Sequence, residues 1–167
     1  WTPDECALYA LGVGAGTGEL AFTTENTASA PQRVLPTMVS TIGKGGGAGQ
    51  GDVLSFGTYG LHQVVQAAQR VELFGALPPR GRVLATMRIA GIWDKRAAAL
   101  VQLETTARSP DTGAIVYKSV ASLLVLGKGG FGGERGPVLG AHRHPSRPPD
   151  HVVRAATHPE QAEFKWR

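Results

Sequence analysis

The sequence predicts an α+β fold in which a short N-terminal helix precedes an antiparallel β-sheet. Two observations predict it: helix-start residues occupy positions 2–5, and apolar and polar residues alternate in several segments between positions 64 and 126. The chain has 167 residues, of which 42% are hydrophobic and 18% are charged. This composition is typical of one globular domain and not of a disordered tail.

The N-terminal helix is predicted from its capping residues. Thr2 can accept a hydrogen bond from the first turn of the helix, and Pro3 suits the first helical position. Glu5 lies three residues after Thr2, as a capping box requires. Gly12 is expected to end this helix.

A second short helix is expected over residues 35–42, where Pro36 can occupy an early helical position. Residues 43–51 follow it, and six of these nine residues are glycine. Because each glycine disfavours a helix by about 1 kcal/mol relative to alanine, this segment is predicted to be a flexible loop.

The later part of the chain predicts four strands. Residues 64–74 are the first candidate, and residues 82–93 alternate so that a core is expected to contact Val83, Ala85, Met87 and Ile89. Residues 101–106 alternate more strictly, which predicts one solvated face. Residues 109–113 have the composition of a turn. Residues 114–126 end in an apolar run typical of a central strand buried on both faces.

The composition changes after Gly127. Residues 128–156 contain clustered glycines and prolines together with several basic residues, which predicts a linker without regular structure. Residues 157–160 again have the pattern of a capping box with an early proline. We therefore expect a folded domain at residues 1–127, a basic linker at 128–156 and the start of a second domain at 157–167.

Charge and cysteine content argue against several classes of protein. The net charge of +4, from 17 basic and 13 acidic residues, is too small to predict nucleic-acid binding by itself. No segment approaches the roughly 20 apolar residues of a membrane-spanning helix, and residues 1–5 lack the features of a signal peptide. The single Cys6 cannot form an internal disulfide, and its thiol is expected to be packed in the fold.

No cofactor-binding or metal-binding motif is complete. The glycines at 12–16 follow a predicted helix instead of a strand, so they do not form a dinucleotide-binding turn. Lys44 is followed by Gly45 and not by Ser or Thr, so the glycine-rich loop is not a P-loop. His142 and His144 could bind a metal only with partners from elsewhere, and they are expected to be exposed. We expect no metal and no bound cofactor.

Five segments resemble successive signatures of one family, at residues 6–16, 34–37, 70–81, 93–95 and 127–135. On these segments the chain resembles the N-terminal half of the 2-enoyl-CoA hydratase 2 family. These are MaoC-like dehydratases that include the hydratase part of the peroxisomal multifunctional enzyme type 2. The resemblance implies a hot dog fold, a curved antiparallel sheet around a central helix that the glycine-rich loop would shorten here. It also implies that this chain is the N-terminal half of a double hot dog.

The resemblance implies hydration of a trans-2-enoyl-CoA to the (3R)-3-hydroxyacyl-CoA. In the family, the C-terminal hot dog carries a catalytic Asp followed five residues later by His. The residues five positions after the aspartates of this chain are Tyr9, Gly57, Ala99, Val116 and Ala155. The chain therefore contains no such dyad, and a catalytic hot dog half is expected as its partner, in the same polypeptide or as a separate subunit. A homo- or hetero-oligomer, such as a dimer, is expected.

The resemblance also assigns three candidate substrate-binding residues. Lys95, in the turn at residues 94–96, corresponds to a family lysine that contacts the CoA portion, and an ammonium group suits a phosphate. A lysine at a hairpin tip without a ligand is the alternative interpretation. Gln66 and Ala67 occupy the positions of a His-Gly pair of the family, and His62 lies four residues too early to replace that histidine. A glutamine can still donate a hydrogen bond.

Two other functions remain open: a non-catalytic subunit that binds acyl-CoA or acts as a scaffold, and a hot dog thioesterase, since one fold serves both chemistries. The shortened helix would leave space for a bulky acyl group such as a steroid side chain. The pathway is therefore expected to be the β-oxidation of fatty acids or of steroid side chains. The expected compartment is the cytoplasm of a bacterium with a GC-rich genome, or the peroxisome if the source is a eukaryote.

Overall fold

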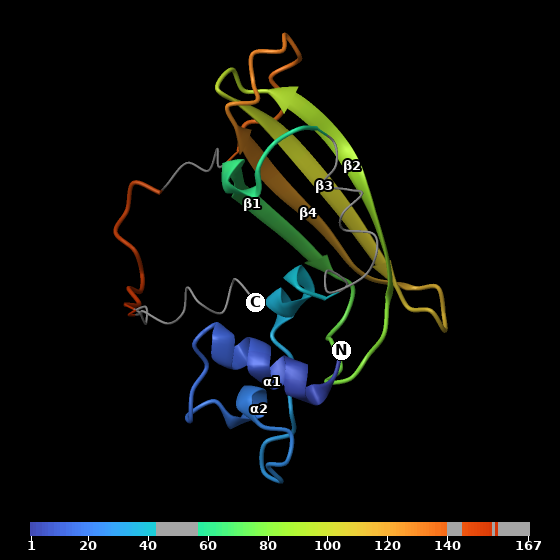
Figure 1. The fold of residues 1–167 in the computed structure, drawn as a ribbon. Helices are drawn as coiled ribbons and strands as arrows, with labels where there is room; N and C mark the ends of the chain where they lie inside the picture. Colours follow the sequence, from blue (N-terminus) through green and yellow to red (C-terminus); the bar gives the residue numbers. More distant parts are fainter. Residues whose placement is uncertain (43–56, 140–144, 155, 157–167) are drawn as a thin grey trace.

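The structure is a computed structural model that describes residues 1–42, 57–139, 145–154 and 156 (Figure 1). Its elements, in chain order, are α1 (Pro3–Gly12), α2 (Leu20–Thr23), the 3-10 helices η1 (Pro36–Ser40) and η2 (Leu61–Gln63), and the strands β1 (Val64–Leu73), β2 (Leu84–Asp94), β3 (Ala98–Arg108) and β4 (Ile115–Leu126). These elements confirm the predicted α+β class. The predictions for residues 43–51, for the histidines at 142 and 144 and for 157–167 lie outside the described residues.

Helix α1 begins and ends where its sequence predicts. The Thr2 hydroxyl accepts a hydrogen bond from the Glu5 backbone N–H at 3.3 Å, and the Glu5 carboxylate accepts one from the Thr2 N–H at 2.8 Å. These two bonds form the capping box. The helix ends at Gly12 and buries Cys6, Ala7 and Ala10. Figure 1 shows α1 and α2 beyond one end of the sheet.

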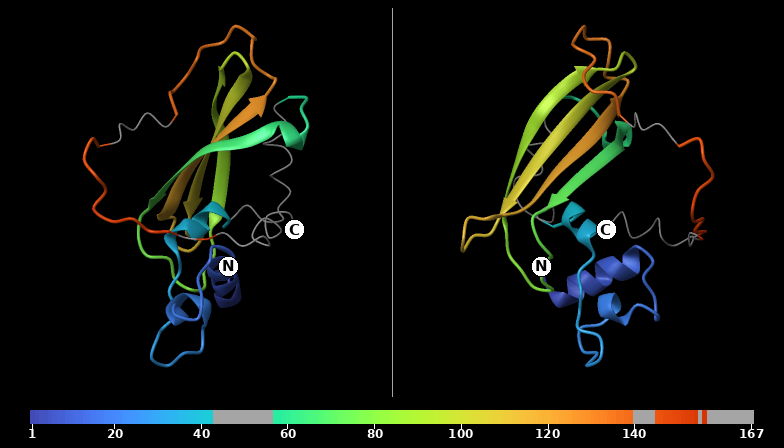
Figure 2. Two further views of the ribbon diagram at one scale, coloured as in Figure 1. Left: turned by 90° about the vertical axis from the view of Figure 1, so that its left-hand side faces the viewer. Right: turned by 180° about the vertical axis from the view of Figure 1, so that it is seen from behind.

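The four strands form one antiparallel sheet in the order β1-β4-β3-β2, which confirms the four predicted strands. The predicted turn at residues 109–113 joins β3 to β4. The Ser109 N–H donates to the Ala114 carbonyl at 2.9 Å, and Gly113 has a φ of 72°, which glycine adopts without steric cost. The two views of Figure 2 show that the sheet is twisted and curved.

Two consecutive buried residues of β3, Leu100 and Val101, point to opposite faces of the sheet, which are called the Leu100 face and the Val101 face. On the Val101 face, four residues lie level across the strands: Gln66, Leu123, Val101 and Ile92. On the opposite, Leu100 face, the corresponding residues are Val65, Leu124, Leu100 and Trp93. Further along β3, residues 103, 105 and 107 are buried, while residues 102, 104 and 106 are half-buried. This pattern confirms the strict alternation predicted for residues 101–106.

The expected burial of β4 on both faces is wrong. β4 is a central strand as predicted, but Val120, Leu123 and Leu124 are only half-buried and Leu126 is 46% exposed. Helices α1, α2 and η1 lie at one end of the sheet and do not extend over its middle (Figure 2). The apolar run of β4 therefore predicts the central position of this strand correctly, but not its burial on both faces.

Strand β2 also contacts the core less than its pattern predicts. Val83 and Met87 pack against the two apolar clusters of the fold. Ala85 is exposed, however, and Ile89 is 39% exposed. β2 is an edge strand of the described sheet, so its side chains have strand neighbours on one side only.

The segment expected as a second helix packs against the Val101 face. It forms the 3-10 helix η1 and not an α-helix over residues 35–42. Four β-branched residues in this stretch, Thr37, Val39, Thr41 and Ile42, weaken the α-helical propensity. Met38 and Val39 are 4% and 0% exposed and belong to an apolar cluster with Cys6, Ile42, Leu77, Ala107 and Tyr117.

The hydroxyl of Tyr117 connects this segment to β4. It donates a hydrogen bond of 2.7 Å to the Ile42 carbonyl, and Tyr117 is 1% exposed. We expect Tyr117→Phe to lower the free energy of unfolding by about 1–3 kcal/mol, because the substitution leaves a buried carbonyl without its donor. Chemical denaturation followed by circular dichroism measures this change. Tyr9→Phe is the control, since it removes a hydroxyl that makes no described hydrogen bond; equal stability of both variants would contradict the prediction.

Candidate functional site

The turn after β2 is held by the side chain of Asp94, which is 7% exposed. One carboxylate oxygen accepts hydrogen bonds from the backbone N–H groups of Arg96 at 2.7 Å and Gly130 at 2.8 Å. The other accepts one from the Gly132 N–H at 2.8 Å. Asp94 therefore joins the β2–β3 turn to the glycine-rich segment that follows β4.

These hydrogen bonds lower the pKa of Asp94 below its ordinary value. The backbone N–H of Gly130 contributes most, followed by that of Arg96, and both stabilise the ionised carboxylate. Removal of the carboxylate from water acts in the opposite direction and is outweighed. Asp94 is thus an ionised acceptor at neutral pH and not a candidate general acid.

Glycines are required in this segment by its backbone. Gly130 and Gly132 have φ angles of 79° and 78°, which L-residues rarely adopt. A Cβ on Gly129 would meet the carbonyl oxygens of Arg96 and Ala98, the latter at 2.6 Å. The resemblance signature at residues 127–135 therefore encodes a tightly packed segment around Asp94.

Lys95 lies in the same turn and is half-buried. Its Nζ donates a hydrogen bond of 2.7 Å to the Pro137 carbonyl. An ammonium group has three donors, so two remain for a ligand. Arg96, Lys128 and Arg135 lie in the turn and the adjoining segment and add positive charge there. The role of Lys95 in CoA binding stays a prediction.

Gln66 and Ala67 lie on β1, at a register shift between Gln66 and Ala68 in its pairing with β4. Both residues are exposed. The Gln66 Nε2 donates a hydrogen bond of 3.0 Å to the Oε1 of Gln69. Strict alternation would place Gln69 on the opposite face of the strand from Gln66, three residues before it, so the sequence pattern does not predict this contact. The register shift between Gln66 and Ala68 changes that alternation, and no pattern in the sequence predicts this shift.

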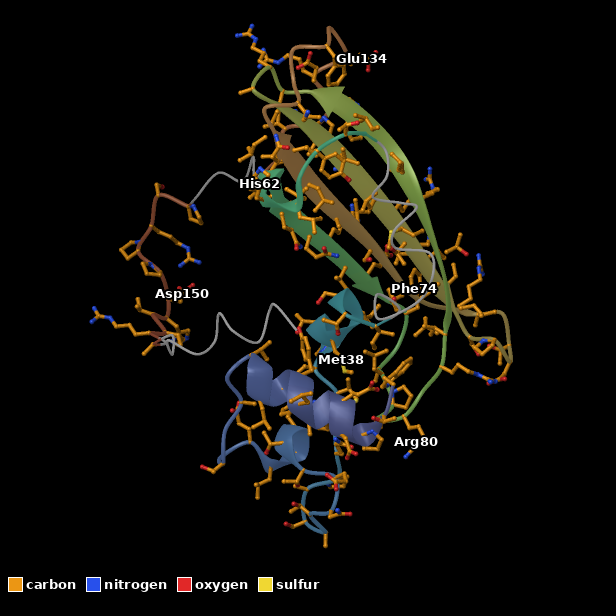
Figure 3. All side chains as sticks on the ribbon, in the orientation of Figure 1. Met38, His62, Phe74, Arg80, Glu134 and Asp150 are labelled. Atoms are coloured by element: carbon orange, nitrogen blue, oxygen red, sulfur yellow. The ribbon has the colours of Figure 1, made fainter. Side chains whose placement is uncertain are left out.

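Lys95 and Gln66 lie at the same end of the sheet but at opposite edges. The Asp94 N–H donates to the Glu134 carbonyl at 2.8 Å, and Figure 3 shows Glu134 at the same end as His62, which precedes β1. Three strand spacings separate β1 from β2, about 14 Å at the usual spacing. The structure therefore does not bring Lys95 and Gln66 into contact, and only an extended ligand could reach both.

Residues 1–127 match the model of a known protein family, described as "MFE-2 hydratase 2 N-terminal domain". The chain belongs to this family. Two curated relatives extend the match over 97% of the chain. The chain is 37% identical over 164 residues to "3-hydroxyacyl-thioester dehydratase Y" and 38% identical over 168 residues to "Enoyl-CoA hydratase ChsH3", both from Mycobacterium tuberculosis. It covers 55% and 57% of their lengths. The chain thus spans about half the length of these relatives.

A solved structure supports the fold of this hydratase 2 N-terminal domain. A MaoC-like dehydratase from Phytophthora capsici matches with a TM-score of 0.76 and 22% identity, covering 98% of this chain and 56% of that chain. This likeness confirms the hot dog fold that the resemblance implies. At this identity it shows the fold alone.

The described part of the hydratase 2 N-terminal domain shows neither a metal-binding cluster nor a reactive thiol. It contains no cluster of three or more His, Cys, Asp or Glu side chains that could hold a metal ion. Cys6 is buried as predicted, its Sγ donates to the Pro79 carbonyl at 3.3 Å, and burial raises the pKa of the thiol. A thiol in this state is a poor nucleophile. Across the residues described, no helix is long and apolar enough to span a membrane.

We expect Asp94→Asn to lower the thermal stability of this hydratase 2 N-terminal domain in a pH-dependent way. Because the pKa of Asp94 is lowered in the folded state, its contribution to stability is fully present above its unfolded pKa of about 4. The contribution is lost as the pH falls through the folded pKa. The difference in melting temperature between the parent and the variant should therefore be largest above about pH 4 and shrink in more acidic buffer.

The matched control is Asp111→Asn. Asp111 forms an exposed ion pair with Arg82 at 3.2 Å, and such pairs contribute little to stability. Melting temperatures measured from pH 2.5 to 7 by scanning calorimetry distinguish the two sites. A constant difference for Asp94→Asn across this range would contradict the proposed ionised state.

Proposed function

We propose that this chain is the substrate-binding N-terminal half of an (R)-specific 2-enoyl-CoA hydratase. The reaction adds water to a trans-2-enoyl-CoA and yields the (3R)-3-hydroxyacyl-CoA. The observation that carries the proposal is the family match over residues 1–127, together with relatives named as a hydratase and a dehydratase of acyl thioesters. A non-catalytic scaffold subunit and a thioesterase are less favoured by these names.

The proposed hydration requires catalytic groups that are assigned to no residue of this chain. Hydration needs a base that activates water toward the β-carbon, an acid that protonates the α-carbon, and donors that hold the thioester oxygen as negative charge develops. The Asp and His of the family pattern would supply the proton transfers from a second hot dog half. We propose that this half lies in the same polypeptide or in a partner subunit, in keeping with the share of its relatives that the chain spans.

The N-terminal half would then bind the CoA thioester. Lys95 has two spare donors and lies among further basic residues of the turn and the adjoining segment, which suits the phosphates of CoA. Gln66 and Ala67, on the far edge of the sheet, would lie closer to the acyl group. The distance of about 14 Å across the sheet suits the extended arm of CoA.

The organisation and setting of the protein follow the same proposal. The substrate-binding domain would comprise residues 1–127, a basic linker residues 128–156, and the start of the catalytic hot dog residues 157–167. The acyl group would derive from a fatty acid or from a steroid side chain during β-oxidation. The compartment would be the bacterial cytoplasm, or the peroxisome in a eukaryote.

The activity test uses the complete natural polypeptide that contains this sequence, with its partner subunit if one copurifies. Crotonyl-CoA and a long-chain trans-2-enoyl-CoA should both lose their conjugated double-bond absorbance, and chiral analysis should identify the (3R)-alcohol. An (S)-product would contradict the proposed stereochemistry. Binding of CoA thioesters without any hydration would favour the non-catalytic subunit instead.

A second test concerns Lys95. We expect Lys95→Ala to weaken CoA binding roughly 5- to 10-fold, because a charge-assisted hydrogen bond to phosphate is lost. Lys95→Arg should retain most of the affinity. Lys118→Ala is the control, since Lys118 lies on β4 beside Phe74, with its Nζ 5.7 Å from the ring centroid. Isothermal titration calorimetry measures all four proteins; equal affinities of the parent and Lys95→Ala would leave Lys95 as a hairpin-tip residue.

A further inference from the structure

Two glutamine side chains form a polar pair at the edge of a mainly apolar sheet face. Gln66 is level with Leu123, and Gln69 is level with Ala121, so both glutamines lie on the Val101 face. Leu123 and Ala121 pack against the buried cluster of Ala99, Val101, Leu103 and Val125. The pair therefore borders a buried apolar cluster of this face.

The register shift in β1 brings the two glutamines together. Without it, residues 66 and 69 would lie on opposite faces, because successive side chains of a strand alternate. The shift between Gln66 and Ala68 inserts one residue, so Gln69 returns to the face of Gln66. The hydrogen bond of 3.0 Å from the Gln66 Nε2 to the Gln69 Oε1 follows from this shift.

The amide nitrogen of Gln69 is left without a partner. Its Nε2 is buried and makes no hydrogen bond to any described group. A buried donor without an acceptor costs free energy, so such groups are rare in folded proteins and call for an explanation. Because Gln66 already donates to the Oε1 of Gln69, the unpartnered Nε2 is the group of this amide that remains to bind a ligand.

We propose that the Nε2 of Gln69 donates a hydrogen bond to an uncharged oxygen of the acyl group of a CoA thioester. This inference rests on the proposed function, because it names the part of that substrate which the Val101 face recognises. An apolar surface with one fixed donor suits an acyl chain that carries a carbonyl or hydroxyl oxygen. Gln66 is the positioning residue, since its amide holds that of Gln69.

The residues around the pair support an uncharged acceptor. The residues level with Gln66 and Gln69 on the other strands of this face, Leu123, Val101, Ile92, Ala121, Leu103 and Ile89, are all apolar. A phosphate or carboxylate at this place would lose its hydration without gaining a cation. The basic residues of the Lys95 turn lie at the opposite edge of the sheet, about 14 Å away across the strands, where the phosphates of the same ligand would bind.

Three inert ligands test the proposal and separate its two oxygen sources. Butyryl-CoA carries the thioester carbonyl, and S-(3-hydroxybutyl)-CoA, a thioether, carries only the hydroxyl. S-butyl-CoA, also a thioether, carries neither oxygen. Calorimetric titration of the complete natural polypeptide and of its Gln69→Leu variant should show roughly 5- to 10-fold weaker binding of at least one oxygen-bearing ligand. The affinity for S-butyl-CoA should be unchanged.

The melting temperature of the unliganded protein is a second measurement. Replacement of a merely structural residue would lower it, whereas replacement of Gln69 should not. Gln69→Leu removes a buried donor that is unpaired without ligand, and it also removes the hydrogen bond from Gln66. Gln66 is exposed, so water can replace that bond, and the unliganded variant should melt no lower than the parent. Gln69→Met, which is closer in shape, should behave in the same way. The matched control is Gln102→Leu on the Leu100 face. It should lower the melting temperature, because the hydrogen bond of 3.0 Å from Gln102 to Ser122 is lost, and should leave the ligand affinities unchanged.

Each outcome decides the matter. A loss confined to butyryl-CoA identifies the carbonyl as the acceptor, a loss confined to S-(3-hydroxybutyl)-CoA identifies the hydroxyl, and a loss for both supports a donor shared between them. Unchanged affinities in both Gln69 variants, or an equal loss that includes S-butyl-CoA, would overturn this inference and leave the proposed function standing. If the parent protein binds none of the three ligands, the proposed function fails and this inference fails with it.

Discussion

The pairing of β3 with its two neighbours is the constraint on which the other features depend. β3 begins with four buried residues, Ala98 to Val101, so its apolar side chains occupy both faces of the sheet at once. A shift by one residue would exchange the two faces along the whole strand. With this register, Ala98 lies opposite Leu126, and the Gly127 N–H donates to the Ala97 carbonyl at 2.8 Å. The segment after β4 must therefore begin beside the turn after β2.

Asp94 stabilises the contact between the β2–β3 turn and the segment after β4, but the strand pairing brings the two together. The sheet brings the glycine-rich segment close, and the carboxylate then binds its backbone N–H groups, which have no strand partners there. An ionised acceptor suits this role because hydrogen bonds to charged groups are stronger than those between neutral groups. The same turn presents Lys95, so the groups proposed to bind phosphate depend on the sheet end and on Asp94 together.

The proposal that this half binds the substrate and a second half transfers protons rests on the side chains that the sheet presents. Its Val101 face is mainly apolar around the glutamine pair at one edge, and Thr105 and Ser119 are buried further along it. The sequence contains no Asp followed five residues later by His, as in the family pattern. Such a face suits the binding and orientation of an acyl chain, which is the role proposed for this half. Acid-base groups on a second hot dog half would act on a ligand that this half holds, which separates binding from bond formation in one active site.

Local rules determined much of this protein from its sequence. The capping box of α1, the four strands and the turn at Gly113 depend on nearest neighbours, so side-chain period and turn chemistry were sufficient to predict them. Sequence motifs also identified the family and the hot dog fold. Burial of β4 and β2 was predicted less well, because it depends on which elements cover the sheet. Only the tertiary structure placed Gln69 beside Gln66 and closed the segment after β4 onto Asp94, because a β-bulge and contacts between residues 36 positions apart leave no local pattern.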